Sequence, residues 1–144
     1  MRPPLDIGIV GCGIAGLAVG TLLAREGHRV RVFDRLDAPA PVGSGLILQP
    51  VGLAVLDKLG LSEEIAALGA RIERLFGRVV PSGRIVLDVR YGALEEEGVG
   101  LSVHRAALFH VLHMAARRAG VGIESGCEVV ATEAGQGPHR PLVH

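Results

Sequence analysis

Apolar residues in the first third of the chain follow two different periods. Residues 5–10 are mostly isoleucine, leucine and valine, which is typical of a buried strand. The apolar positions of residues 14–26 repeat with helical spacing, and Gly27 stands where a helix commonly ends. Residues 28–33 then alternate between polar and apolar side chains, as a strand does. The pattern predicts a strand, a helix and a second strand, which is the repeating unit of a parallel sheet.

The turn between the first strand and the helix contains three glycines at the spacing of a dinucleotide-binding loop. Gly11 allows a tight turn, Gly13 lets the backbone approach a pyrophosphate, and Gly16 lets the helix lie close to the strand. Ile14 and Ala15 are the first residues of the predicted helix. The N-terminus of this helix offers free N–H groups and the positive end of the helix dipole to phosphates. We therefore expect this turn to hold the phosphates of a dinucleotide.

Asp34 directly follows the second strand, where dinucleotide-binding folds carry an acidic residue for a ribose. Its carboxylate can accept hydrogen bonds from both ribose hydroxyls, and its charge would repel a 2′-phosphate. The alternative is that Asp34 only caps a turn at the end of a strand.

A β-hairpin is predicted over about 74–89. Its arms, residues 74–80 and 84–89, are rich in valine, isoleucine and leucine, and Pro-Ser-Gly between them suits a turn. An antiparallel hairpin departs from strict alternation of strand and helix. We expect it to belong to a second, substrate-side layer of the fold.

Turn residues and apolar spacing also predict the remaining elements. Residues 133–144 lack periodicity and are expected to form a loop or a disordered tail. The other predicted elements are a loop over 35–45, a short strand over 46–49, helices that begin at Pro50 and Ser62, a helix from His104 to about residue 118, and strands over 121–123 and 128–132.

Composition narrows the class of protein. The 144 residues carry 15 Lys and Arg against 15 Asp and Glu, without a basic cluster, so no nucleic-acid partner is expected. Residues 7–24 are uncharged, but their five glycines favour a strand and turn over a membrane span. No secretory signal precedes them, and the two cysteines suggest reduced thiols, so we expect a cytoplasmic protein.

A metal site is not expected. His110 and His113 have the spacing of a metal-binding pair on a helix, but no Cys, Asp or Glu stands near them in sequence to complete a site. Exposed histidines on helices are also common.

Four segments together resemble a known family. They are Gly11-Cys-Gly-Ile-Ala-Gly16, Val32-Phe-Asp-Arg35, Gly43-Ser-Gly-Leu-Ile-Leu-Gln-Pro50 with the leucine-rich helix after it, and Val103-His-Arg-Ala-Ala-Leu108. In this order and spacing they resemble the N-terminal part of the flavin-dependent aromatic-ring monooxygenases, the hydroxybenzoate-hydroxylase-like flavoproteins. The resemblance implies an α/β fold. Residues 1–132 would form a Rossmann-like FAD/NAD(P)-binding domain, into which the hairpin is inserted.

The resemblance also implies roles for individual residues. It places Asp34 on the adenosine ribose of FAD, Arg35 beside the adenine, and the backbone around Val129 against the adenine. Arg105 would reach the pyrophosphate or ribityl chain, where a planar guanidinium suits phosphate oxygens, and Gly45 belongs to the cofactor-binding loop. The alternative for Arg105 is a solvated residue in the first turn of a helix.

The family's downstream Asp-Gly and Gly-Asp motifs are absent from this chain, so we expect an N-terminal fragment of a longer protein. The expected activity of that protein is FAD-dependent hydroxylation of an aromatic or polyketide-like small molecule with O₂ and NADH or NADPH. No catalytic residue can be named. The alternatives are an NAD-dependent dehydrogenase and a truncated product that binds a dinucleotide without catalysis. The substrate and oligomeric state are not predicted.

Overall fold

The computed structural model describes residues 3–38, 43–93, 98–134 and 141–143. The chain divides into two compact units, one formed by residues 1–42 with 108–144 and the other by residues 43–107. The division expected from the sequence, with one domain over 1–132, stays a prediction.

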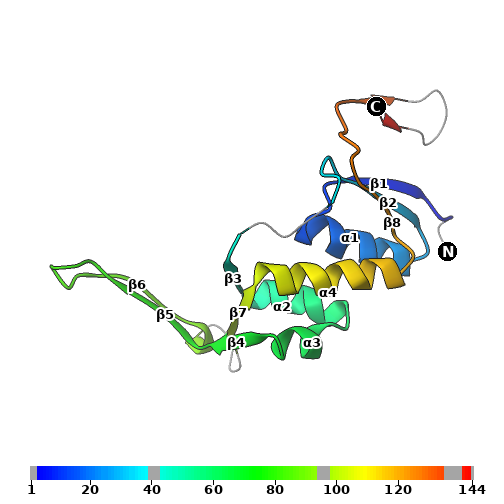
Figure 1. The fold of residues 1–144 in the computed structure, drawn as a ribbon. Helices are drawn as coiled ribbons and strands as arrows, with labels where there is room; N and C mark the ends of the chain where they lie inside the picture. Colours follow the sequence, from blue (N-terminus) through cyan, green and yellow to red (C-terminus); the bar gives the residue numbers. More distant parts are fainter. Residues whose placement is uncertain (1–2, 39–42, 94–97, 135–140, 144) are drawn as a thin grey trace. The chain divides into compact units, whose positions relative to one another are not determined.

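The first unit is built on a parallel sheet. Its strands are β1 (Asp6–Val10), β2 (Arg29–Phe33) and β8 (Gly122–Glu124), in the order β1-β2-β8. Helix α1 (Ile14–Arg25) lies against one face of this sheet (Figure 1). Because the strands are parallel, their carboxyl ends and the loops that follow them meet at one edge. The strand, helix and strand predicted for the start of the chain are confirmed.

Close packing of α1 on the sheet depends on small and buried side chains. A Cβ atom at Gly20 would lie 3.4 Å from Ile9 Cδ1 and 3.5 Å from Val32 Cγ2. Leu17 and Thr21 are fully buried beside it, and the Thr21 hydroxyl donates to the Leu17 carbonyl at 2.7 Å. That bond satisfies the buried Thr21 hydroxyl.

Helix α4 (Arg105–Arg118) starts in the second unit and belongs to the first from Leu108 onward. Its buried side chains follow the predicted apolar spacing. They are Leu108, Val111, Leu112, Ala115 and Ala116. Gly120, with φ of +82°, ends the helix and leads into β8.

The second unit contains an antiparallel sheet of β3 (Gly45–Leu48), β7 (Gly100–His104) and β4 (Gly69–Ile72), in the order β3-β7-β4. Helices α2 (Pro50–Lys58) and α3 (Ser62–Ala66) follow β3. Both helices were predicted. Neither β4 nor β7 was, because each is four or five residues long and carries little alternation of its own.

The predicted hairpin is confirmed as a two-stranded ribbon. Strands β5 (Arg74–Arg78) and β6 (Ile85–Arg90) pair antiparallel, and the ribbon extends from the end of β4 (Figure 1). A short 3₁₀ helix (Tyr91–Ala93) follows it. Tyr91 is buried, and a Cβ atom at Gly100 would lie 2.8 Å from its ring, so the start of β7 requires a residue without a side chain.

One prediction for the end of the chain is wrong. Residues 128–131 form no strand, since hydrogen bonds from the loop after β8 to the loop after β2 direct the chain away from the sheet and leave Val130 72% exposed. Strands β9 (Thr132–Ala134) and β10 (Pro141–Val143) pair antiparallel. Hydrogen bonds between the two backbones stabilise these strands, although their side chains show no alternation. Proline is tolerated as the first residue of a strand, which is its position in β10. Residues 135–140 and 144 of the expected loop or disordered tail lie outside the described residues, and the tail stays a prediction there.

Candidate functional site

The glycine loop has the geometry that its sequence predicts. Gly11 adopts φ of +101°, a conformation that L side chains rarely take, and its N–H donates to the Phe33 carbonyl at 2.7 Å. A Cβ atom at Gly16 would overlap the carbonyl oxygen of Gly11. The loop and the first turn of α1 therefore approach each other more closely than any larger residue would allow.

Gly13 has a different role from its neighbours. It is the N-cap of α1, with φ of −90° and ψ of −177°, and a Cβ atom there would find no protein atom within 4 Å. Since the backbone of Gly13 is unstrained and its surroundings are open, the fold itself does not require glycine at this position. The first N–H groups of α1 lack acceptors within the helix, as at any helix N-terminus.

The Asp34 carboxylate lies against the glycine loop. Its Oδ2 accepts from the Cys12 backbone N–H at 2.7 Å, and its Oδ1 accepts from the Leu36 N–H at 2.9 Å. The structure thus brings the predicted ribose residue and the predicted phosphate loop together, although they are 22 residues apart in sequence. Each carboxylate oxygen has a second lone pair for a further donor.

A third loop joins this group from the carboxyl end of β8. Cys127 N–H donates to the Asp34 carbonyl at 2.8 Å, and Gly126 N–H donates to the Leu36 carbonyl at 3.0 Å. Asp34 N–H in turn donates to the Glu124 carbonyl at 2.9 Å. Sequence reasoning found Asp34 but missed Leu36 and Gly126. The Leu36 contact could have been anticipated, since an aspartate often accepts from the backbone two residues on.

Cys12 is a buried thiol. Its side chain is 2% exposed, and burial, together with the neighbouring Asp34 charge, raises the pKa of the thiol. A thiol with a raised pKa is a poor nucleophile at neutral pH. Both cysteines are free, and Cys127 is half-buried.

The predicted site residues of the second unit also meet. The Arg105 N–H donates to the Ser44 carbonyl at 3.3 Å, and β3 pairs with β7 so that Gly45 stands opposite His104. The Arg105 side chain passes over Gly43, where a Cβ atom would lie 3.3 Å from Nε. The glycine-containing loop and Arg105, identified separately in the sequence, are therefore neighbours in space.

Two other predicted site residues, Arg35 and Val129, lie in loops. Arg35 is exposed on the loop after β2. Val129 is half-buried, and it follows the loop after β8 instead of lying in a strand. Their predicted places beside an adenine stay predictions.

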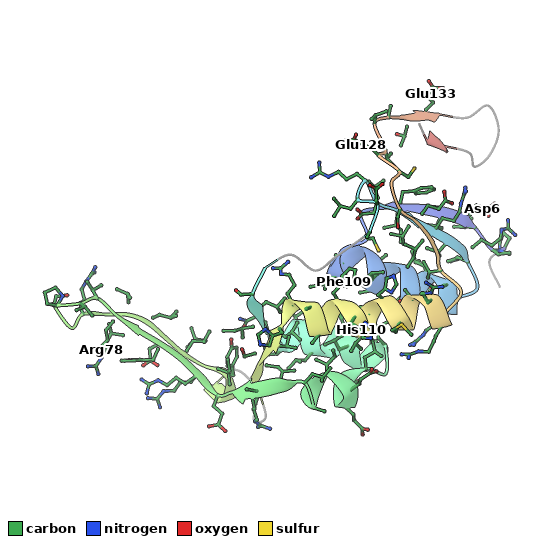
Figure 2. All side chains as sticks on the ribbon, viewed as in Figure 1. Asp6, Arg78, Phe109, His110, Glu128 and Glu133 are labelled. Carbon is green, nitrogen blue, oxygen red and sulfur yellow. The ribbon has the colours of Figure 1, made fainter. Side chains whose placement is uncertain are left out.

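The two histidines of α4 that have metal-binding spacing, His110 and His113, lie next to an aromatic side chain. Phe109 and His113 stack with ring centroids 5.7 Å apart, and His110 lies one residue beyond Phe109 on the same helix (Figure 2). Burial, followed by the charges of Arg117 and His110, lowers the pKa of His113. Within the described ranges, no three His, Cys, Asp or Glu side chains gather as metal ligands would.

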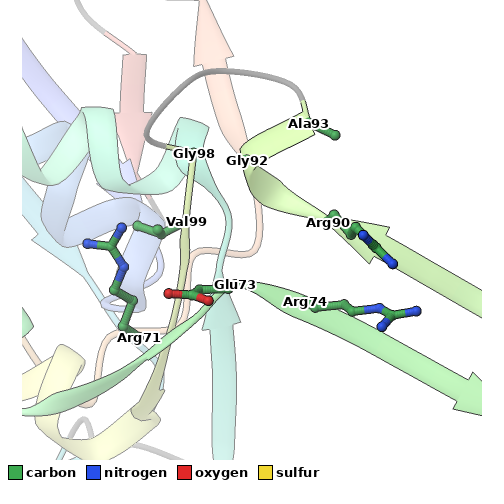
Figure 3. Close-up of a pocket in the computed structure, with 8 residues that line it drawn as sticks. All are labelled: Arg71, Glu73, Arg74, Arg90, Gly92, Ala93, Gly98 and Val99. Atoms are coloured by element: carbon green, nitrogen blue, oxygen red, sulfur yellow. The ribbon is translucent and has the colours of Figure 1, made fainter.

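An open cavity of about 630 Å³ lies in the second unit near the base of the ribbon (Figure 3). Arg71, Glu73, Arg74 and Arg90 contribute its charged side chains. Arg74 donates to both carboxylate oxygens of Asp88, at 2.6 and 2.8 Å, and thereby lowers the pKa of that carboxyl. The cavity shares no lining residue with the predicted nucleotide site.

Comparisons with known proteins identify the family. The sequence model of the family described as an FAD binding domain matches residues 4–143. The 3-amino-4-hydroxybenzoate 2-monooxygenase of Streptomyces cremeus is 37% identical over 111 residues, which are 75% of this chain and 28% of that protein. The 6-hydroxynicotinate 3-monooxygenase of Bordetella bronchiseptica is 30% identical over 118 residues, or 80% of this chain and 30% of that protein.

A solved structure gives the same fold. The tetrameric form of 2-methyl-3-hydroxypyridine-5-carboxylic acid oxygenase superposes with a TM-score of 0.78 at 23% identity, over 92% of this chain and 34% of that one. The chain thus spans about a third of the length of these relatives. The predicted α/β fold class is confirmed. Because the family model matches nearly the whole chain, this protein belongs to the FAD-binding domain family.

Proposed function

We propose that this chain holds the adenosine diphosphate part of FAD within an NAD(P)H-dependent flavoprotein monooxygenase. The single observation that carries the proposal is the contact between Asp34 and the glycine loop, in which the carboxylate accepts from the Cys12 N–H at 2.7 Å. This contact holds Asp34, the acid that we propose for the ribose, beside the loop that precedes the N-terminus of α1. It is the pairing that a dinucleotide requires.

The residues present fit such a group. The open space at Gly13 admits a phosphate against the first amides of α1, which would donate hydrogen bonds to it. Asp34 would accept from the ribose hydroxyls, with its orientation already fixed by two backbone donors. Arg105 is proposed for the pyrophosphate or ribityl chain. Bound FAD would supply the redox chemistry, by taking a hydride from NAD(P)H and passing electrons to O₂.

We propose the substrate class of the whole protein from the activities of its relatives. The relatives named above are monooxygenases of hydroxybenzoate and hydroxynicotinate compounds, and another, from Streptomyces rimosus, is 6-methylpretetramide 4-monooxygenase. We infer an aromatic or polyketide-like small molecule as the substrate, with O₂ as the second one. No helix in the described part of the chain is long and apolar enough to cross a membrane. The two free cysteines support a cytoplasmic location.

An NAD-dependent dehydrogenase is the competing assignment, since NAD shares the adenosine diphosphate group. The second unit argues against this assignment. Its strands β3, β7 and β4 form an antiparallel sheet, whereas a dehydrogenase would continue its series of parallel strands in this part of the chain.

Titration of the 144-residue chain with FAD, ADP, NAD and FMN tests the proposal. We expect weak binding of FAD and ADP and none of FMN, which lacks the adenosine. We also expect NAD(P)H oxidation, if any, to yield hydrogen peroxide and no hydroxylated product, because relatives of this chain are about three times longer. Tight binding of NAD without FAD binding would refute the flavoprotein assignment, and product formation coupled to NAD(P)H consumption would refute the assignment of a partial site.

A further inference from the structure

The loop after β8 is hydrogen-bonded to the backbone of Leu36 and Asp34 in the loop after β2. The Leu36 N–H donates to the Asp34 carboxylate at 2.9 Å, and the Leu36 carbonyl accepts from the Gly126 N–H at 3.0 Å. A second bond, from Cys127 N–H to the Asp34 carbonyl at 2.8 Å, holds the same two loops together. The position of Leu36, and with it one of the two donors that orient Asp34, therefore depends on Gly126.

Gly126 can make these contacts only in a conformation that favours glycine. Its φ is +66°, in the left-handed region. A Cβ atom built there would lie 2.8 Å from Asp37 Oδ1, closer than real contacts allow. Any other residue would strain the left-handed backbone and push aside the exposed Asp37 carboxylate, and the backbone strain would weaken the hydrogen bond from Gly126 to Leu36.

We propose that Gly126 is a positioning residue of the nucleotide site: its left-handed conformation lets the β8 loop fix Leu36 and so hold the Asp34 carboxylate toward the ribose. This inference rests on the proposed function, because it assumes that the site receives an adenosine. Gly126 itself touches no reacting group. Its effect on binding passes through Leu36 and Asp34.

Gly120 offers a matched control. It also has positive φ, +82°, and stands in the same unit, four residues before the end of β8, but a Cβ atom there would meet no atom within 4 Å. Gly120→Ala therefore adds similar backbone strain without disturbing the junction between the two loops. A general loss of stability would affect both variants alike.

The test measures ADP and FAD affinity of the 144-residue chain by calorimetry, with thermal unfolding measured in parallel. Gly126→Ala is expected to weaken both ligands about five- to tenfold, and Gly120→Ala to change neither by more than about twofold. In an Asp34→Ala background the effect of Gly126→Ala should shrink to within about twofold, because the carboxylate that Gly126 helps to orient is gone.

Two further variants keep the test decisive if Gly126→Ala unfolds. Gly126→Asn places a residue that tolerates left-handed φ, and combined with Asp37→Ala, which removes the overlapping carboxylate, it should recover most of the lost affinity. The positioning role would be overturned if wild type and Gly126→Ala bound ADP and FAD with equal affinity. It would also be overturned if Gly126→Ala reduced the affinity equally in the wild-type and Asp34→Ala backgrounds. Failure of wild type to bind any adenine nucleotide would instead refute the proposed function, and the positioning role with it.

Discussion

Replacement of Gly13 by valine should separate cofactor binding from folding. The backbone of Gly13 is extended, with φ of −90° and ψ of −177°, which valine adopts without strain. A Cβ atom there would meet nothing within 4 Å. The folding cost is then limited to the loss of a favourable N-cap residue, about 0.5–1 kcal/mol.

The cost to binding is larger. A branched side chain would occupy the space through which a phosphate reaches the first amides of α1. Charge-assisted hydrogen bonds contribute about 1.5–3 kcal/mol each, so the loss of one of them weakens FAD or ADP binding by about 10- to 150-fold. Calorimetric titration measures the affinity, and thermal unfolding followed by circular dichroism measures the fold.

Gly16→Val is the matched contrast, because its Cβ atom would overlap the Gly11 carbonyl oxygen. That variant should lose stability and binding together. The reasoning is refuted if Gly13→Val binds FAD as tightly as wild type, or if it unfolds as Gly16→Val does.

Three other predictions, on Asp34, the cysteines and His113, test separate parts of the structure. Asp34→Ala should weaken FAD about tenfold or more by removing the acceptor for the ribose, without affecting any FMN binding; unchanged FAD affinity would mean that Asp34 only ends a strand. A thiol reagent at neutral pH should modify Cys127 and spare Cys12, whose thiol is buried and has a raised pKa, and equal labelling by mass spectrometry would contradict this. Because the pKa of His113 is lowered, the unfolded chain binds the proton more readily, so stability should fall as the pH drops below the ordinary histidine pKa of about 6.5. Arg117→Gln should raise the pKa of His113 in an NMR titration and reduce that loss, and an unmoved pKa would exclude the guanidinium as a cause.

Local signals explain most of what could be predicted. The apolar periods and glycines of residues 5–34 are enough to define β1, α1 and β2, because each period and each turn residue is a local signal, even though β2 pairs with β1 and with the distant β8. The ribbon of β5 and β6 was also predictable, since a short turn joins its arms. At the candidate site, Gly11, Gly13, Gly16 and Asp34 follow from their spacing alone.

The tertiary structure decided what depends on distant partners. Strand β7 exists because it pairs with β3 and β4, and β4 exists because it pairs with β7, not because of their own patterns. Residues 128–131 have the composition of a strand, but hydrogen bonds to residues 34–36 direct the chain elsewhere. Gly126 acquires its significance only from Asp37 and Leu36, about ninety residues earlier in the chain. Sequence determines what each segment can form, whereas hydrogen bonds between remote segments decide which of those conformations is kept.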